Sequence, residues 1–187
     1  MCASATVCAD FKVFEHLLSV HLRLFMECSG VLPTTQFAHR KGLGTAMHFC
    51  ACHIHHKVAL DSGQEAMIVQ IDFSAAFDRV NQQGILYKIC SLGIGGSVLS
   101  MLTQFLSNRA QHVMVDGCWS KLINVMSGML QLTVWGLLFY LLYTSELFSI
   151  LENKPIGYVD DFTLIAVVPS PSIRVTISCH LQALGLQ

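Results

Sequence analysis

PIGYVDDFTLIAVV, residues 155–168, places two adjacent acids between β-prone apolar segments. Such flanks predict a β-hairpin, with Tyr158-Val159-Asp160-Asp161 at its turn. Asn-Gly or Asp-Gly would form a tight turn more readily, so something other than the turn has selected the acids. Adjacent carboxylates repel and raise each other's pKa unless a cation lies between them, which indicates a divalent metal. A solvated loop end is the alternative, because acid pairs in loops are common.

A second acid ends another predicted strand. Residues 67–73, MIVQIDF, are β-prone, and Asp72 lies where this buried strand meets its following turn. If the strand pairs with the hairpin in one sheet, Asp72, Asp160 and Asp161 converge at its rim. Three carboxylates suit Mg²⁺, which prefers oxygen ligands and keeps waters and substrate phosphates in its shell. Capping of the next helix is the alternative for Asp72, and for Asp78 it is the favoured role.

Composition limits the class of protein. The 187 residues correspond to one domain of average size or to part of a larger protein. The chain is 53% hydrophobic and 12% charged, as expected of a fragment rich in core residues. Its net charge of −1 argues against strong nucleic-acid affinity by this chain alone. Eight irregularly spaced cysteines and no secretory pattern predict an intracellular protein with reduced thiols, in nucleus or cytoplasm.

The remaining periodic segments predict helices and a second hairpin. A helix is expected over residues 11–28, capped by Asp10 and stopped by Gly30. An Asp-Gly turn at residues 116–117 predicts a hairpin. The inward stripe expected for the first helix comprises Phe11, Phe14, Leu18, Leu22 and Phe25. The other expected elements are hairpin strands at 111–115 and 120–125, helical structure from residue 75, and helices at 81–92, 97–107, 131–151 and after Pro171. This order predicts an α+β fold with an antiparallel sheet carrying helices on one face.

The uncharged segment 122–145 raises a membrane alternative. About 20 apolar residues suffice to span a bilayer, and this segment contains an intensely apolar run at 137–142. Small and polar residues interrupt it, however, and no basic cluster flanks it to set an orientation. A helix buried in a crowded core has the same composition, so no membrane association is expected.

The histidines and cysteines between His48 and His56 raise a zinc alternative. Structural zinc sites usually take their ligands from two separated pairs, and no second pair follows here. On a helix continuing from Thr45 these side chains would also point in different directions. Metal binding by this cluster stays open.

Four motifs together resemble the reverse transcriptase domain of non-LTR (LINE-type) retrotransposons. They are QFAHRKGLGT at residues 36–45 in the fingers, IDFSAAFD at 71–78 as the first catalytic motif, SGMLQ at 127–131 opening the nucleotide-contact helix, and YVDD at 158–161 as the second catalytic motif. The resemblance extends from about Phe11 to Val168. The order and spacing of the motifs are specific, whereas the tetrapeptide alone is not.

The resemblance implies an RNA-directed DNA polymerase. Asp72, Asp160 and, less directly, Asp161 would hold two Mg²⁺ ions. Phe77 would lie under the sugar of the incoming nucleotide and exclude a ribose 2′-OH, and Phe73 and Gln131 would contact the same substrate. The implied partners are an RNA template, a DNA primer and deoxynucleoside triphosphates. The implied architecture is a partial fingers domain at 1–60 and an incomplete palm at 61–187, without a thumb.

The sequence departs from the family pattern in the nucleotide-contact segment. The family has Gln-Gly followed by Gly-Pro, whereas here Gln131 precedes Leu132 and Gly136 precedes Leu137. A glycine beside a substrate lets backbone approach closely, so Leu132 is expected to impair nucleotide binding. The family's basic fingers hairpin, its thumb and the endonuclease domain of many such elements are also expected to be missing.

Three hypotheses follow from these patterns. The first is a polymerase domain, active alone or with missing parts supplied. The second is an inactive retroelement remnant whose exposed apolar surface promotes aggregation. The third is a small membrane protein, which the family resemblance disfavours.

Overall fold

The computed structural model describes residues 9–107, 109–131, 133–151, 153 and 155–168. The chain forms two compact units, and each is discontinuous in sequence. The first unit combines Met1–Pro33 with Phe73–Phe148, and the second combines Thr34–Asp72 with Ser149–Gln187. Leu132 and the helix expected after Pro171 lie outside the described residues.

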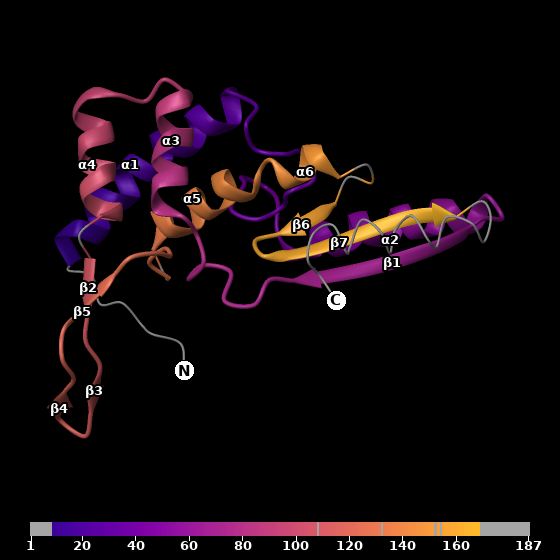
Figure 1. The fold of residues 1–187 in the computed structure, drawn as a ribbon. Helices are drawn as coiled ribbons and strands as arrows, with labels where there is room; N and C mark the ends of the chain where they lie inside the picture. Colours follow the sequence, from indigo (N-terminus) through magenta and orange to yellow (C-terminus); the bar gives the residue numbers. More distant parts are fainter. Residues whose placement is uncertain (1–8, 108, 132, 152, 154, 169–187) are drawn as a thin grey trace. The chain divides into compact units, whose positions relative to one another are not determined.

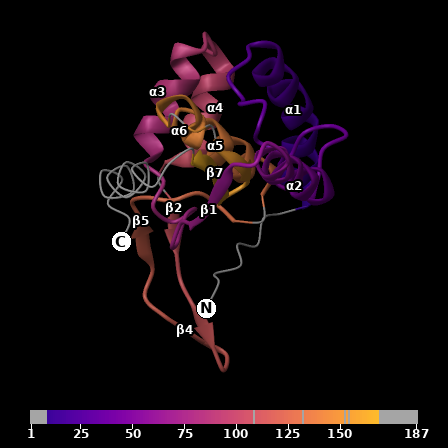
Figure 2. The same cartoon turned by 90° about the vertical axis from the view of Figure 1, so that its right-hand side faces the viewer.

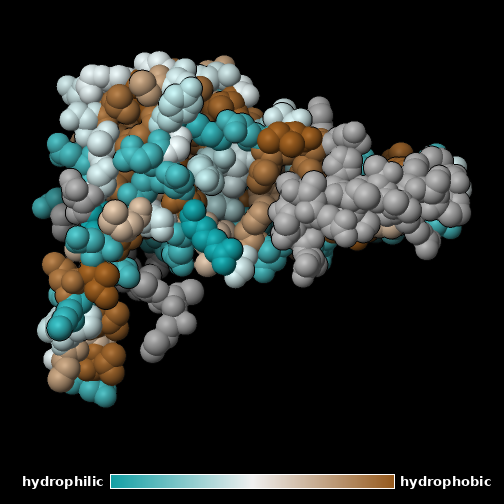
Figure 3. Space-filling model, in the orientation of Figure 1, coloured by the Kyte–Doolittle hydropathy of each residue, from teal (hydrophilic) through white to brown (hydrophobic). Residues whose placement is uncertain are grey.

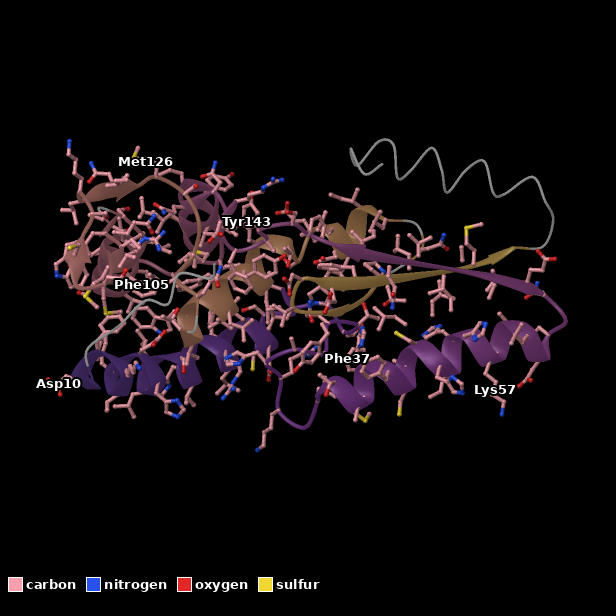
Figure 4. All side chains as sticks on the ribbon, turned by 90° about the horizontal axis from the view of Figure 1, so that it is seen from below. Asp10, Phe37, Lys57, Phe105, Met126 and Tyr143 are labelled. Atoms are coloured by element: carbon pink, nitrogen blue, oxygen red, sulfur yellow. The ribbon has the colours of Figure 1, made fainter. Side chains whose placement is uncertain are left out.

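An antiparallel sheet forms the centre of the second unit. Strand β7 (Asp161–Val168) lies between β1 (Glu65–Asp72) and β6 (Ile156–Tyr158), as Figure 1 shows. The turn motif therefore does join two strands of a hairpin, and the strand expected at 67–73 pairs with it. The prediction that this strand is buried is wrong, because β1 lies at the edge of the described sheet and only Ile71 in it is buried. Helix α2 (Thr45–Asp61) contacts all three strands and runs along the sheet in Figure 4. The mixed helix and antiparallel-sheet class is confirmed.

Helices form most of the first unit. Helix α5 (Val134–Thr144) is its apolar centre and contacts α1 (Ala9–Cys28) and α3 (Gln82–Ser91), while α3 also contacts α4 (Gly96–Leu106). The boundaries of α3 and α4 lie within one residue of those predicted. Asn81 accepts a hydrogen bond from the Gly84 amide and so caps α3. The expected capping of this helix by Asp78 is therefore wrong, because residues 74–79 form turns before it.

The buried face of α1 differs from the predicted stripe. Leu22 is buried, but Phe14 is 45% and Phe25 39% exposed, whereas Glu15 is only 3% exposed. The Glu15 carboxylate accepts a hydrogen bond from the Trp135 backbone amide at 2.8 Å, and the Glu15 carbonyl accepts one from the Trp135 indole at 3.1 Å. This contact with the first turn of α5 turns the polar Glu15 inward. Apolar periodicity cannot predict such an orientation, because it assumes that acids face solvent.

Both ends of α1 were predicted, and one prediction is wrong. The helix already includes Ala9, so Asp10 lies in its first turn and is not its cap. An acid there still interacts favourably with the helix dipole. Gly30 has φ +65°, a conformation that favours glycine, and the helix ends before it as predicted.

The apolar segment near residue 140 forms a shorter helix than expected. Helix α5 begins at Val134 because the Thr133 hydroxyl caps it by accepting from the Gly136 amide at 3.0 Å, so Gln131 does not open it. It ends at Thr144, and the separate turn α6 (Leu147–Ile150) follows. None of the helices among the described residues has the length and apolarity needed to cross a bilayer.

The predicted Asp-Gly hairpin is confirmed. Strand β2 (Arg109–Gln111) pairs with β5 (Ile123–Val125), and β3 (Met114–Val115) pairs with β4 (Cys118–Trp119). Positive φ at both turn residues, +50° and +78°, matches the type I′ turn that Asp-Gly favours. In Figures 1 and 2 the hairpin extends away from the helices of its unit. Its apolar side chains are largely exposed (Figure 3).

Candidate active site

The pairing of β1 with β7 aligns two of the three predicted acids. Asp72, the last residue of β1, is directly opposite Asp161, the first residue of β7. Directly opposed residues of an antiparallel pair have their Cβ atoms about 4.5–5.5 Å apart on one face of the sheet. Tyr158 also pairs with Asp161, so Val159 and Asp160 form a two-residue hairpin loop. The sheet therefore brings Asp72 and Asp161 together, with Asp160 next to them in the turn.

A buried glutamine holds this turn in place. Gln36 is 1% exposed, and its side-chain oxygen accepts hydrogen bonds from the Val159 amide at 3.2 Å and the Ala38 amide at 3.1 Å. Its side-chain nitrogen donates to the Val159 carbonyl at 3.3 Å. On either side, the Phe37 amide donates to the Gly157 carbonyl and the Gly157 amide donates to the Thr35 carbonyl, each at 2.9 Å. Gln36 thus bridges the segment before α2 to the acidic turn.

This contact explains an unusual backbone conformation. Val159 has φ +60°, which is strained for a β-branched residue. The Gln36 side chain donates to the Val159 carbonyl and accepts from the Val159 amide, so both polar groups of this backbone are satisfied in this conformation. The fingers motif that begins at Gln36 was recognised from the sequence, but the role of Gln36 in positioning the turn was not. The local sequence around a buried glutamine does not indicate which distant residue its side chain contacts.

The electrostatics of the turn follow from its geometry. Burial raises the pKa of the Asp160 carboxyl, and the negative charges of Asp161 and Asp72 raise it further, against the lowering effect of a backbone hydrogen bond. The repulsion predicted for the acid pair is therefore present, and it includes the acid of the facing strand. A bound cation would relieve this repulsion.

The three acids have suitable chemistry for a divalent cation, although their side chains are not already arranged around a metal position. All three are carboxylates, the hard oxygen donors that Mg²⁺ prefers. Among the described residues, however, no group of three or more His, Cys, Asp or Glu side chains is arranged to hold a metal ion. Asp72 and Asp161 are exposed, so their side chains have room to rotate toward a cation.

The lack of a metal-holding group among the described residues also concerns the histidine and cysteine cluster of α2. His48 is buried and lies edge-on to the Phe37 ring, while the Cys52 sulfur lies 3.9 Å from its Nε2 atom. Cys50, His53 and His55 are exposed along the helix, and His56 is half-buried. His48 and Cys52 thus share one face of α2, and among the described residues no group of three such side chains is placed to hold a metal ion.

The predicted substrate-contact residues belong to the first unit, whereas the three acids belong to the second. The half-buried Phe77 ring stacks on Tyr140, with ring centroids 4.5 Å apart. The Gln131 side-chain nitrogen donates to the Asp78 carboxylate at 3.4 Å. Phe73, also half-buried, directly follows β1. Asp78 thus contacts a predicted nucleotide-contact residue instead of capping a helix.

Two predicted motifs lie against each other in the first unit. The Met129 amide donates to the Phe77 carbonyl and the Gly128 amide to the Val80 carbonyl, both at 2.8 Å. Gly128 has φ +83°, and a Cβ atom there would lie 2.9 Å from the Asp78 backbone. The glycine of SGMLQ is therefore required for this close approach.

Comparison with known proteins identifies the family. The family model described as "Reverse transcriptase (RNA-dependent DNA polymerase)" matches residues 4–184. The probable RNA-directed DNA polymerase from transposon X-element of Drosophila melanogaster is 31% identical over 141 residues, which are 73% of this chain and 15% of that protein. The RNA-directed DNA polymerase from mobile element jockey of Drosophila funebris is 28% identical over 173 residues, or 92% of this chain and 19% of that protein. Its counterpart in Drosophila melanogaster is 28% identical over 179 residues, with 94% and 19% covered.

The chain therefore belongs to the reverse transcriptase family. The resemblance to the reverse transcriptase domains of LINE-type retrotransposons is confirmed by these relatives. The chain spans less than a fifth of the length of each of these three relatives.

Proposed function

We propose that this chain forms the catalytic core of an RNA-directed DNA polymerase in which Asp72, Asp160 and Asp161 hold Mg²⁺. The observation that carries the proposal is the register of β1 and β7, which aligns Asp72 with Asp161 beside Asp160. The raised pKa of the Asp160 carboxyl supports it, because the repulsion among the acids is what a cation would relieve. Membership of the reverse transcriptase family supports the same chemistry.

The proposed reaction is nucleotidyl transfer. The 3′-hydroxyl oxygen of a DNA primer forms a bond to the α-phosphorus of a deoxynucleoside triphosphate, the bond to the β-phosphate oxygen breaks, and pyrophosphate leaves. The hydroxyl proton is lost to solvent. The three carboxylates would hold and orient two Mg²⁺ ions, which would supply Lewis-acid activation of the hydroxyl and charge neutralisation at the departing pyrophosphate. Gln36 holds the turn that carries Asp160.

Substrate selection is assigned by resemblance. Phe77 would lie against the deoxyribose and exclude a 2′-hydroxyl, and Phe73 and Gln131 would contact the nucleotide. The stack of Phe77 on Tyr140 supports this role, because it restrains the ring. Leu132 would reduce affinity for the nucleotide, although its position lies outside the described residues. Leu137 is half-buried in α5.

The proposed architecture follows the family. Residues 1–60 would form part of the fingers and residues 61–187 an incomplete palm, as a piece of a retrotransposon polyprotein that acts inside the cell. An RNA template and a DNA primer are the proposed partners. The overall charge of −1 fits a core that needs other segments to grip the duplex, because duplex affinity comes largely from phosphate contacts.

Primer extension on an RNA template, with Mg²⁺ and four deoxynucleotides, tests this proposal. The chain is expected to extend the primer, and Asp160→Asn is expected to abolish extension. Asp116→Asn is the matched control, because it makes the same chemical change in a hairpin turn where asparagine is equally suitable. Equal extension by wild type and Asp160→Asn would refute the assignment of the acids. No extension by wild-type protein that circular dichroism shows to be folded would favour the inactive remnant.

A further inference from the structure

Two side chains from outside the nucleotide-contact motif hold its first turn, residues 127–131. The Gly128 carbonyl accepts one hydrogen bond from the Arg109 guanidinium and another, at 3.2 Å, from the Gln82 side-chain nitrogen. A carbonyl oxygen has two lone pairs, so these two donors satisfy it fully. Gln82 is the first residue of α3 and Arg109 the first of β2. Two separate elements therefore converge on one backbone group, and we call this pair of bonds the Gly128 clamp.

Arg109 connects the clamped turn to the end of a helix. Its Nη2 atom donates to Gly128, while its Nε atom donates to the Leu106 carbonyl at 3.2 Å. Leu106 is the last residue of α4, which β2 follows in Figure 1, and its carbonyl has no donor within the helix. A cation at this end of a helix also interacts favourably with the helix dipole. Arg109 is half-buried, and burial lowers the pKa of its guanidinium, so hydrogen bonds must offset the cost of burying this charge.

The clamped turn lies against the end of the first catalytic motif. The Ser127 hydroxyl donates to the Asp78 carbonyl at 3.1 Å, and the Met129 amide donates to the Phe77 carbonyl at 2.8 Å. Gln131, two residues after Met129, donates from its side chain to the Asp78 carboxylate. A displacement of the turn would therefore move Gln131 relative to Phe77, the residue assigned to the sugar of the nucleotide.

We propose that Arg109 is a positioning residue for nucleotide binding, and that it acts with Gln82 by clamping the Gly128 carbonyl. Neither side chain has to touch the nucleotide, because the clamp fixes the turn that carries Gln131. The inference rests on the proposed function, since Phe77 and Gln131 contact a nucleotide only there. Contacts that bind substrate and transition state equally set KM and not kcat. Loss of the clamp should therefore weaken nucleotide binding and leave the chemical step unchanged.

Primer extension by the full chain at varied deoxynucleotide concentration tests this role. Arg109→Met removes both hydrogen bonds but keeps an unbranched side chain, and a pocket of about 410 Å³ beside Arg109 and Gln82 gives it room. The KM is expected to rise about tenfold with kcat within about twofold of wild type, and Arg109→Lys, which keeps a donor, should raise it less. A variant that only lost stability would lose active enzyme, and so kcat, at an unchanged KM. Arg23→Met is the matched control, because Arg23 is a half-buried arginine on α1.

Amide hydrogen exchange, followed by NMR without substrates, tests the clamp independently of catalysis. The Gly128 and Met129 amides are hydrogen-bonded, and they are expected to exchange about tenfold faster in Arg109→Met and in Gln82→Met than in the Arg23→Met control. Equal exchange in all variants would overturn the clamp, whether or not the chain extends a primer.

The two measurements together separate this inference from the proposed function. Faster exchange with an unchanged KM would overturn the role of Arg109 in nucleotide binding, although the chain is then a working polymerase. If the wild-type chain extends no primer, the proposed function fails and the nucleotide-binding role fails with it, while the exchange rates still decide whether Arg109 and Gln82 hold the turn.

Discussion

Replacing Gln36 by methionine would show how far one buried carboxamide holds the acidic turn. The side chains have similar volume, so Gln36→Met removes hydrogen bonds with little change in packing. Three bonds are lost, at 3.1, 3.2 and 3.3 Å, and the Val159 and Ala38 amides lose their side-chain acceptor. Each buried unsatisfied amide costs about 1–3 kcal/mol. Because the bonds are long, the lower end applies, and the free energy of unfolding should fall by about 2–3 kcal/mol.

Relaxation of the turn offsets part of this loss. Val159 is held at φ +60°, a conformation that costs of order 1–3 kcal/mol, and the variant frees it to return to negative φ. The net destabilisation is therefore about 1–2 kcal/mol, which small domains with about 5–15 kcal/mol of stability survive. The freed turn no longer orients Asp160, so Mg²⁺ affinity should fall more than the stability loss alone explains.

Urea unfolding followed by circular dichroism, and calorimetric titration with Mg²⁺, measure the two effects. Gln70→Met is the matched control, because Gln70 is exposed on β1, the same strand that ends at Asp72. The control should change stability by less than about 0.5 kcal/mol. If Gln36→Met unfolds like the control and binds Mg²⁺ like the wild type, the bonds from Gln36 do not position the turn.

Four further predictions concern Asp160, Gly136, Leu132 and Phe77. The raised pKa of Asp160 means that its ionisation opposes folding, so the contribution of this carboxyl to stability is greatest below the ordinary aspartate pKa of about 4 and is lost as pH rises through the raised value. In urea titrations of metal-free protein, Asp160→Asn should therefore be more stable than wild type at pH 7 by a few tenths of a kcal/mol but not at pH 3, and a gap independent of pH would contradict this cause. Gly136→Ala places a Cβ 2.1 Å from the Leu130 carbonyl oxygen and should cost about 3 kcal/mol in urea unfolding, whereas Gly84→Ala, whose nearest contact is 3.5 Å, should be neutral or stabilising. Leu132→Gly should lower the KM for deoxynucleotides in primer extension, and an unchanged KM would exclude Leu132 as the impairment. Phe77→Val should admit ribonucleotides about tenfold more readily relative to deoxynucleotides, and an unchanged ratio in single-nucleotide incorporation would remove Phe77 from sugar selection.

Local patterns predicted most elements of this protein. The Asp-Gly turn of the β3–β4 hairpin and Gly30 after α1 are positions where backbone conformation restricts the residue, so their sequence signals are strong. A β-prone apolar run located β7 and an amphipathic pattern located α4, since the residue pattern of a single element is a local property. The order and spacing of four motifs also identified the family.

Sequence alone left the site conditional. Each acid was predicted at a strand end, but their convergence depended on a pairing that only the fold provides, and the register of Asp72 with Asp161 supplies it. Helix α5 is shorter than its apolar run predicted, because the Thr133 cap sets its start. Hydropathy does not mark this boundary, because Thr133 is only one of several small and polar residues that interrupt the segment.

The sequence by itself determined most of the elements and the family, and it predicted the acids as candidate site residues. Only the tertiary structure decided which face of α1 is buried and what holds the acidic turn. Both depend on side-chain to backbone hydrogen bonds across the chain, from Glu15 to Trp135 over 120 residues and from Gln36 to Val159 over 123. Periodicity records whether a residue is apolar, but a buried polar side chain is stable only where a particular partner satisfies it, and that partner is fixed by the fold.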